Sequence, residues 1–214
     1  MSFINFPDPR EVLGDIIHVG GLLSVENLLN AYRRGIFPWP YGDWLPWVCP
    51  ERRAVLEFKN LHVPRSLKKI KGRVPFTFTI DKAFEAVINA CALIPRAHEE
   101  GTWITLQIIR GYTELHKAGY AHSVEAWDGN SLVGGLYGVD AGGAFAGESM
   151  FYLRPYASKL ALLYLIEHLE SRGATWLDVQ VMTPHMNALG TINISRNAFI
   201  EKLNDALSQR LKLF

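Results

Sequence analysis

The sequence predicts an α+β protein with a small N-terminal domain, residues 1–54, and a larger domain, residues 55–214, built on a mixed, mainly antiparallel sheet. Three observations lead to this prediction. Apolar residues recur at helical spacing in several segments, residues 122–151 instead alternate with period two, and the first 50 residues are rich in Pro, Gly and Trp. A chain of 214 residues that is 49% hydrophobic can bury a substantial core.

The first helix is expected at 25–32, where Val25, Leu28, Leu29 and Tyr32 share one face. Ser24 stands at the N-cap position and Gly35 follows the end. The next segment, GIFPWPYGDWLPW, is too rich in Pro for regular structure and too aromatic for a solvated loop. It is either a hydrophobic clamp between two lobes or a stacking surface.

Two more helices follow this segment. Residues 81–92 suit a helix that Asp81 caps, with a buried stripe formed by Phe84, Val87, Ile88 and Cys91. Residues 105–117 suit another helix, which Gly119 closes.

The remaining elements are expected in the order β-β-β-α-β-α. Three strands form a meander over 122–151, and a helix at 158–172, a strand at 176–182 and a helix at 195–211 follow. Acyltransferases of the acetyltransferase-like fold build their catalytic half in this order. However, residues 153–158 contain no glycine, and Pro155 removes a backbone donor where a CoA pyrophosphate would bind. We therefore expect another acyl donor.

Composition and motifs exclude several classes of protein. No apolar run approaches the roughly 20 residues that span a bilayer, and the N-terminus lacks the pattern of a signal peptide. Cys49 and Cys91 match no metal spacing and are expected as reduced thiols. Ser149 lacks the nucleophile-elbow pattern, and His98-Glu99-Glu100 is not a zinc-binding H-E-x-x-H motif. We expect neither a metal nor a bound cofactor.

The net charge of +1 hides a local basic run. Five basic side chains and no acidic one lie between residues 65 and 73, namely Arg65, Lys68, Lys69, Lys71 and Arg73. Such a run is either a solvated face or a site that holds a polyanion such as RNA.

The strand expected at 176–182 carries the most informative polar residues. Leu177, Val179 and Val181 alternate toward one face, which leaves Asp178 and Gln180 on the other, about 7 Å apart. They face either solvent or a polar pocket, and the pocket is favoured because a strand after a buried helix should be central. A buried Asp needs a partner, for which we expect Gln180 or a ligand.

Glu148 raises the same question in the last strand of the meander. Its carboxylate is either capped by backbone donors or kept for the amine of a ligand.

Six short blocks along the chain point to one family. They are YRRGIFPW (32–39), EGTWIT (100–105), GYAHSVE (119–125), LVGGLYGV (132–139), GESMF (147–151) and DVQ (178–180). In order and spacing they closely resemble leucyl/phenylalanyl-tRNA–protein transferases. The resemblance implies a bacterial cytoplasmic enzyme that moves Leu or Phe from aminoacyl-tRNA to the N-terminal amine of proteins beginning with Arg or Lys. These proteins are thereby marked for degradation by the N-end rule pathway, and we expect the enzyme to be a monomer without cofactor.

The resemblance also implies roles for the site residues. Asp178 and Gln180 take the catalytic centre, and Glu148 holds the α-ammonium of the donor amino acid. Trp39 and Trp103 stack on the terminal adenosine, with Tyr32 and Tyr112 nearby. Met150 lines an apolar pocket for the donor side chain, together with Leu136 and Leu165. The basic run between Arg65 and Arg73 contacts the tRNA backbone.

In this interpretation Asp178 orients Gln180 and attracts the cationic N-terminus, and proton acceptance is shared or relayed by water. Two alternatives stay open. One is an aminoacyl transferase that acts on another amine, such as a peptidoglycan precursor, although such enzymes usually have two domains of this kind. The other is a small RNA-binding module, which would explain the basic run and the tryptophans but not Asp178 and Gln180.

Overall fold

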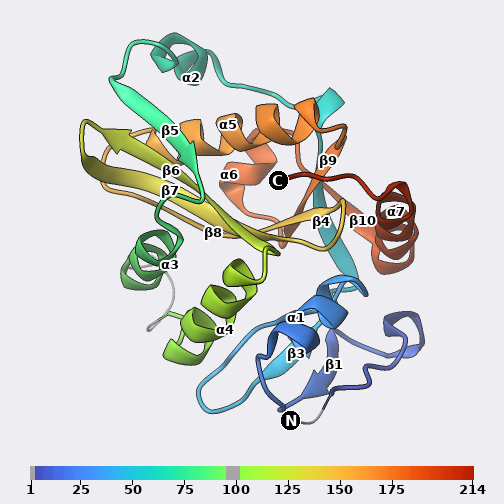
Figure 1. Ribbon diagram of the computed structural model, residues 1–214. Coiled ribbons are helices and arrows are strands. Elements are labelled where there is room, and N and C mark those ends of the chain that lie inside the picture. Colours follow the sequence, from blue (N-terminus) through green and yellow to red (C-terminus); the bar gives the residue numbers. More distant parts are fainter. Residues whose placement is uncertain (1–2, 95–101) are drawn as a thin grey trace.

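The structure is a computed structural model that describes residues 3–94 and 102–214 (Figure 1). It contains a three-stranded sheet, order β1-β3-β2, and a seven-stranded sheet, order β10-β4-β9-β8-β7-β6-β5. Neighbouring strands are antiparallel except β8 and β9, which are parallel. The predicted α+β class with a mixed, mainly antiparallel sheet is therefore confirmed.

The small sheet consists of β1 (Ile16–Val19), β2 (Phe37–Pro38) and β3 (Pro46–Val48). The strands of the large sheet are β4 (Arg52–Glu57), β5 (Phe76–Ile80), β6 (Ala121–Asp128), β7 (Ser131–Asp140), β8 (Phe145–Tyr152), β9 (Trp176–Gln180) and β10 (Ile192–Ser195). The α-helices are α1 (Val25–Tyr32), α2 (Arg65–Ile70), α3 (Phe84–Leu93), α4 (Leu106–Lys117), α5 (Ala157–Ser171), α6 (Pro184–Ala188) and α7 (Arg196–Gln209). Two 3₁₀ helices span Pro9–Glu11 and Phe58–Asn60.

Helices cover both faces of the large sheet. Helix α5 packs on one face of β5 to β8, while α3 and α4 pack on the opposite face and α7 lies against β4 and β10 (Figure 1). Because side chains alternate along a strand, Leu136 of β7 joins the core beneath α5 and Tyr137 joins the core beneath α3 and α4. Helix α1 packs on α4, which brings the N-terminal part of the chain to this second face.

The meander is as predicted, and its glycines allow close backbone approach. A Cβ on Gly134 would lie 2.6 Å from the Cβ of Ala157, and one on Gly135 would lie 2.7 Å from the carbonyl oxygen of Val124. Residues without a side chain are therefore required where α5 begins and where β6 and β7 meet.

Most predicted helices are confirmed, with α1 capped by Ser24 and α4 capped by Thr105. The prediction that Asp81 caps the next helix is wrong, because α3 starts only at Phe84. Asp81 has φ +57° and accepts the backbone N–H of Ser123, while Glu125 accepts the backbone N–H of Ala83. A carboxylate from strand β6 thus fixes the backbone just before the helix, and α3 has no side-chain cap.

The prediction of no regular structure in the Pro- and Trp-rich segment is also wrong. Phe37 pairs with Val48 and Pro38 with Trp47, and Trp47 is fully buried. Proline is compatible with these strands because Pro38 ends the edge strand β2 and Pro46 begins β3.

The predicted domain boundary between residues 54 and 55 lies inside β4 and stays a prediction. The His98-Glu99-Glu100 motif and the first two residues of the EGTWIT block, 100 and 101, lie outside the described residues. In the described part of the chain, no helix combines the length and apolar character needed to cross a membrane. Cys49 and Cys91 are both buried and form no disulfide.

Candidate active site

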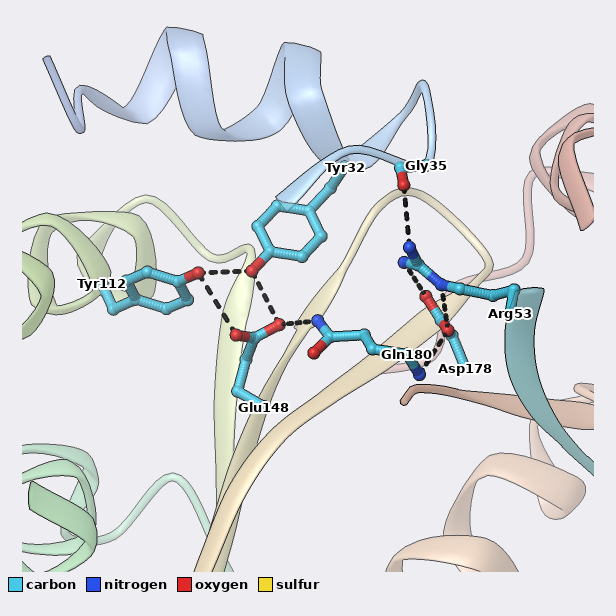
Figure 2. A network of polar contacts seen from close by, with 7 residues as sticks. All are labelled: Tyr32, Gly35, Arg53, Tyr112, Glu148, Asp178 and Gln180. Atoms are coloured by element: carbon cyan, nitrogen blue, oxygen red, sulfur yellow. Dashed lines mark hydrogen bonds and ion pairs between the residues drawn. The ribbon is translucent and has the colours of Figure 1, made fainter. Parts of the chain in front are cut away.

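The site lies where the two parallel strands β8 and β9 part (Figure 2). Ala146 pairs with Asp178, so Glu148 and Gln180, each two residues further on, stand opposite one another after the backbone pairing has ended. Their side chains bridge the gap, because Gln180 Nε2 donates a hydrogen bond of 2.5 Å to Glu148 Oε1. Two residues that the sequence singled out separately therefore form one unit.

Two tyrosines complete the surroundings of Glu148. Tyr32 at the end of α1 donates to Oε1 at 2.7 Å, and Tyr112 of α4 donates to Oε2 at 3.3 Å. Their hydroxyls also hydrogen-bond to each other. Burial raises the pKa of Tyr32 and of Tyr112 well above the usual value, so both remain protonated donors. The donors of Glu148 are thus side chains rather than backbone groups.

The carboxyl of Glu148 is poised between its two protonation states near neutral pH. Burial raises its pKa to about 7, although the hydrogen bonds from Tyr32 and Gln180 act in the opposite direction. A cation placed beside this carboxyl would favour the ionised form. The arrangement therefore suits the recognition of an ammonium group.

The raised pKa predicts that Glu148 destabilises the folded protein at alkaline pH. In the folded state Glu148 keeps its proton up to about pH 7, whereas in the unfolded chain it loses the proton near pH 4.5. The loss of folding free energy is therefore absent below pH 4.5 and complete above about pH 7. At 1.36 kcal/mol per pKa unit its upper value is about 3 kcal/mol, so Glu148→Gln should raise the free energy of unfolding at pH 8 by up to that amount. Urea denaturation at pH 8 and pH 5 checks this, and a gain that does not shrink at pH 5 would contradict it.

The main partner of Asp178 is a residue that the sequence analysis did not predict. It is buried, and its carboxylate forms a bidentate ion pair with Arg53 of β4, with Nε to Oδ1 at 2.8 Å and Nη2 to Oδ2 at 2.7 Å. Gln180, one of the two expected partners, is confirmed, but through its backbone N–H, which donates to Oδ1 at 2.9 Å.

Arg53 is a residue of the candidate site that the sequence analysis missed. It counts among the basic residues near the run at 65–73, yet it belongs to β4 and is buried. The sequence pattern that could have indicated its burial is its position directly before the apolar residues Ala54, Val55 and Leu56.

An apolar cavity of about 240 Å³ opens beside Glu148. Met150, Leu136 and Leu165, which the sequence analysis assigned to an apolar pocket, all line this cavity. Other apolar lining side chains include Leu162 of α5, Leu177 of β9 and Met186 of α6. His185 also lines the cavity, and burial lowers its pKa, so its imidazole is neutral near pH 7. One wall of this cavity thus offers a carboxylate while most of the remainder is hydrophobic.

The two predicted aromatic residues lie side by side. The rings of Trp39 and Trp103 are 6.3 Å apart and inclined by 30°, and the side chain of Trp39 is partly exposed. Trp39 lines a second cavity of about 480 Å³, which shares Val181 with the first. Tyr32 and Tyr112 are buried, so they lie behind Glu148 rather than on an open aromatic surface.

The basic run forms helix α2 and the turn after it. The side chains of Arg65, Lys68, Lys69, Lys71 and Arg73 are exposed, and Lys71 forms an ion pair with Glu167 of α5. In Figure 1, α2 lies at the end of the molecule away from α1 and the small sheet. The structure therefore does not bring the basic run together with the tryptophans.

Comparisons with known proteins agree with the family suggested by the six blocks. Residues 55–204 match the family model of leucyl/phenylalanyl-tRNA protein transferase, and residues 21–51 match the model of its N-terminal domain. A protein of this name from Oleidesulfovibrio alaskensis is 46% identical over 98% of this chain and 87% of its own length. Another, from Pectobacterium carotovorum, is 47% identical over 94% of this chain and 86% of its own length. The chain therefore belongs to the leucyl/phenylalanyl-tRNA–protein transferase family and is an aminoacyltransferase.

Proposed function

We propose that this enzyme transfers leucine or phenylalanine from aminoacyl-tRNA to the N-terminal amine of proteins that begin with Arg or Lys. The observation that carries the proposal is the carboxyl of Glu148 at the wall of an otherwise largely apolar cavity. Recognition of a leucyl or phenylalanyl ester requires both features, one for the α-ammonium and one for the side chain. The proposal includes the acetyltransferase-like fold for residues 55–214, a monomeric state, a cytoplasmic location and a role in N-end rule degradation.

The donor is bound through two neighbouring positions of β8. Glu148 and Met150 both line the cavity, although an irregularity of β8 between Gly147 and Ser149 interrupts the alternation of its side chains. Glu148 holds the α-ammonium, while Met150, Leu136 and Leu165 contact the side chain of the amino acid. Methionine is unbranched and adaptable, which suits a cavity that accepts both Leu and Phe.

The reaction converts an ester into an amide and needs no further activation. The α-amine of the acceptor has a pKa of about 7.7–8.0, so part of it is neutral near pH 7. It attacks the ester carbonyl, the C–N bond forms, and the bond to the adenosine 3′ oxygen breaks. The amine loses a proton through water, and the 3′ oxygen leaves as a hydroxyl. The enzyme contributes mainly orientation and electrostatic stabilisation.

Gln180 orients the attacking amine. Its Nε2 is held by Glu148, which leaves its carbonyl oxygen to accept a hydrogen bond from the amine. Asp178 has both oxygens in the ion pair with Arg53, and we therefore assign it a supporting role instead of direct proton acceptance. The indole rings of Trp39 and Trp103 provide the surface on which the terminal adenine stacks.

The exposed basic residues of α2 contact the tRNA backbone, and this predicts a specific salt dependence. The double change Lys68→Ala and Lys69→Ala should weaken tRNA binding and flatten the plot of log K against log [salt] by about 0.7–0.9 per lost phosphate contact. Filter binding between 50 and 300 mM KCl measures both quantities. Lys117→Ala, which removes an exposed lysine paired with Glu114 on α4, is the control. An unchanged slope in the double variant would place the tRNA elsewhere.

One assay tests the function as a whole. The protein is incubated with radiolabelled leucyl- or phenylalanyl-tRNA and with two peptides that differ only in an N-terminal Arg or Ala. Label in the Arg peptide alone supports the proposal. Binding of tRNA without transfer would instead support an RNA-binding module, and transfer only to a peptidoglycan precursor amine would support the other alternative.

A further inference from the structure

Arg53 is a buried charged side chain to which the proposed reaction assigns no role. Arg53 is only 1% exposed, and its guanidinium contacts four residues. Two nitrogens bind the carboxylate of Asp178, and Nη1 donates to the carbonyl oxygen of Gly35 at 3.0 Å. The guanidinium carbon lies 4.6 Å from the ring centroid of Phe37 and 4.4 Å from that of Phe199.

These contacts make Arg53 a junction between segments far apart in the chain. Gly35 and Phe37 belong to the segment after α1, Phe199 to α7, and Asp178 to β9 (Figure 2 shows the polar contacts). The planar guanidinium can bind a carboxylate through two parallel hydrogen bonds and stack on aromatic rings at once. The ammonium of a lysine carries the same charge but cannot reproduce this geometry.

Asp178 transmits this restraint to Gln180. Its Oδ1 accepts both Arg53 Nε and the backbone N–H of Gln180, so the carboxylate links the two residues directly. Gln180 has φ +65°, in the left-handed region that residues other than glycine adopt only when their surroundings impose it. From this conformation its side chain reaches Glu148.

We propose that Arg53 is a positioning residue that holds Gln180 in its reactive orientation, acting through the carboxylate of Asp178. The inference rests on the proposed function, because it is Gln180 that would contact the attacking amine. It also gives Asp178 a defined task, since a carboxylate with both oxygens bound to a guanidinium is a fixed anchor rather than a proton acceptor. Placement errors of about 1 Å can slow a reaction about 100-fold, so such an anchor affects the rate.

A purely stabilising role for the pair makes a different prediction. Buried ion pairs are often replaced by apolar side chains without loss of stability, whereas removal of one partner leaves an uncompensated charge. The double variant Arg53→Met with Asp178→Leu should therefore fold, and its activity then shows whether the pair serves the reaction.

The main test compares two buried arginines. Arg53→Lys should lower kcat for transfer to an Arg peptide by about 100-fold and leave KM for aminoacyl-tRNA near the wild-type value. Arg196→Lys is the matched control, because Arg196 is also buried and binds the backbone carbonyls of Pro9 and Val12 but does not contact Asp178. Its kcat should stay near that of the wild type. Thermal unfolding confirms that each variant is folded.

A second readout does not depend on transfer. Hydrogen exchange of the Gln180 backbone amide, followed by NMR, should accelerate in Arg53→Lys and not in Arg196→Lys. The inference is overturned if the exchange rate is unchanged, or if Arg53→Lys or the folded double variant transfers with wild-type kcat. If the wild-type protein transfers to no peptide, the proposed function fails, and the exchange measurement alone decides whether Arg53 positions Gln180. If Arg53→Lys does not fold, the double variant decides.

Discussion

Replacing Glu148 with glutamine should lower kcat/KM for leucyl-tRNA by about 100-fold. The substitution keeps the size of the side chain and removes its charge, so the α-ammonium of the donor loses a charge-assisted hydrogen bond. Loss of a buried hydrogen-bonded charge pair costs about 2–5 kcal/mol, and each 1.4 kcal/mol is a factor of ten. Steady-state transfer to an Arg peptide at pH 7.5 measures the effect. Glu114→Gln, which changes an exposed carboxylate on α4, should have no effect and serves as control.

The same substitution should remove a pH dependence. The pKa of Glu148 is raised to about 7, so its carboxyl gains a proton as the pH falls through that value and the attraction for the donor ammonium weakens. The affinity of the wild-type enzyme for leucyl-tRNA, measured without acceptor, should therefore decrease between pH 7.5 and pH 6. Glu148→Gln has no proton to gain there and should bind equally weakly at both values. A parallel decrease in both proteins would mean that another group titrates.

Replacing Gln180 with alanine should lower kcat by about 100-fold, because the amide would orient the attacking amine, and it should change KM for aminoacyl-tRNA less, through the lost hydrogen bond to Glu148. Single-turnover transfer from preformed enzyme–tRNA complex to an Arg peptide isolates this step. Gln107→Ala, at an exposed position of α4, is the matched control.

The variant Gln180→Glu provides a second test, in which donor binding should change as well as kcat. It would place a second carboxyl next to Glu148, where the present side-chain contact is 2.5 Å, and two carboxylates that close cannot both be ionised. Donor binding should then weaken as well, so KM should rise together with the loss of kcat. Wild-type kcat in Gln180→Ala would remove Gln180 from the reaction.

The strands and polar residues of the site could be predicted from the sequence, because side-chain alternation depends only on residues close together in the chain. Period-two alternation identified β8 and β9 and selected Glu148, Asp178 and Gln180 as polar residues on otherwise apolar strands. It did not show that Glu148 and Gln180 meet, because that depends on the parallel register of β8 and β9, in which Ala146 pairs with Asp178.

Such patterns could not predict contacts between residues that are far apart in the chain. Arg53 and Asp178 are 125 residues apart in the chain, and Tyr32 and Glu148 are 116 apart. The apolar spacing of α1 placed Tyr32 on the buried face of that helix, but it did not show that the hydroxyls of Tyr32 and Tyr112 point to one carboxylate. The start of α3 was predicted wrongly for the same reason, since Glu125 of β6 binds the backbone N–H of Ala83 just before the helix.

The sequence by itself determined the α+β class, most helices, the meander and the family, because periodicity, caps and turn residues act over a few positions and the six motif blocks stand in order along the chain. Only the tertiary structure decided which distant groups are in contact. It brings Arg53 to Asp178 and the two tyrosines to Glu148, and it pairs strand β2 with β3. The physical reason is that a buried polar group must be satisfied by whatever donor or acceptor the packing of distant elements brings to it, and local spacing carries no information about that choice.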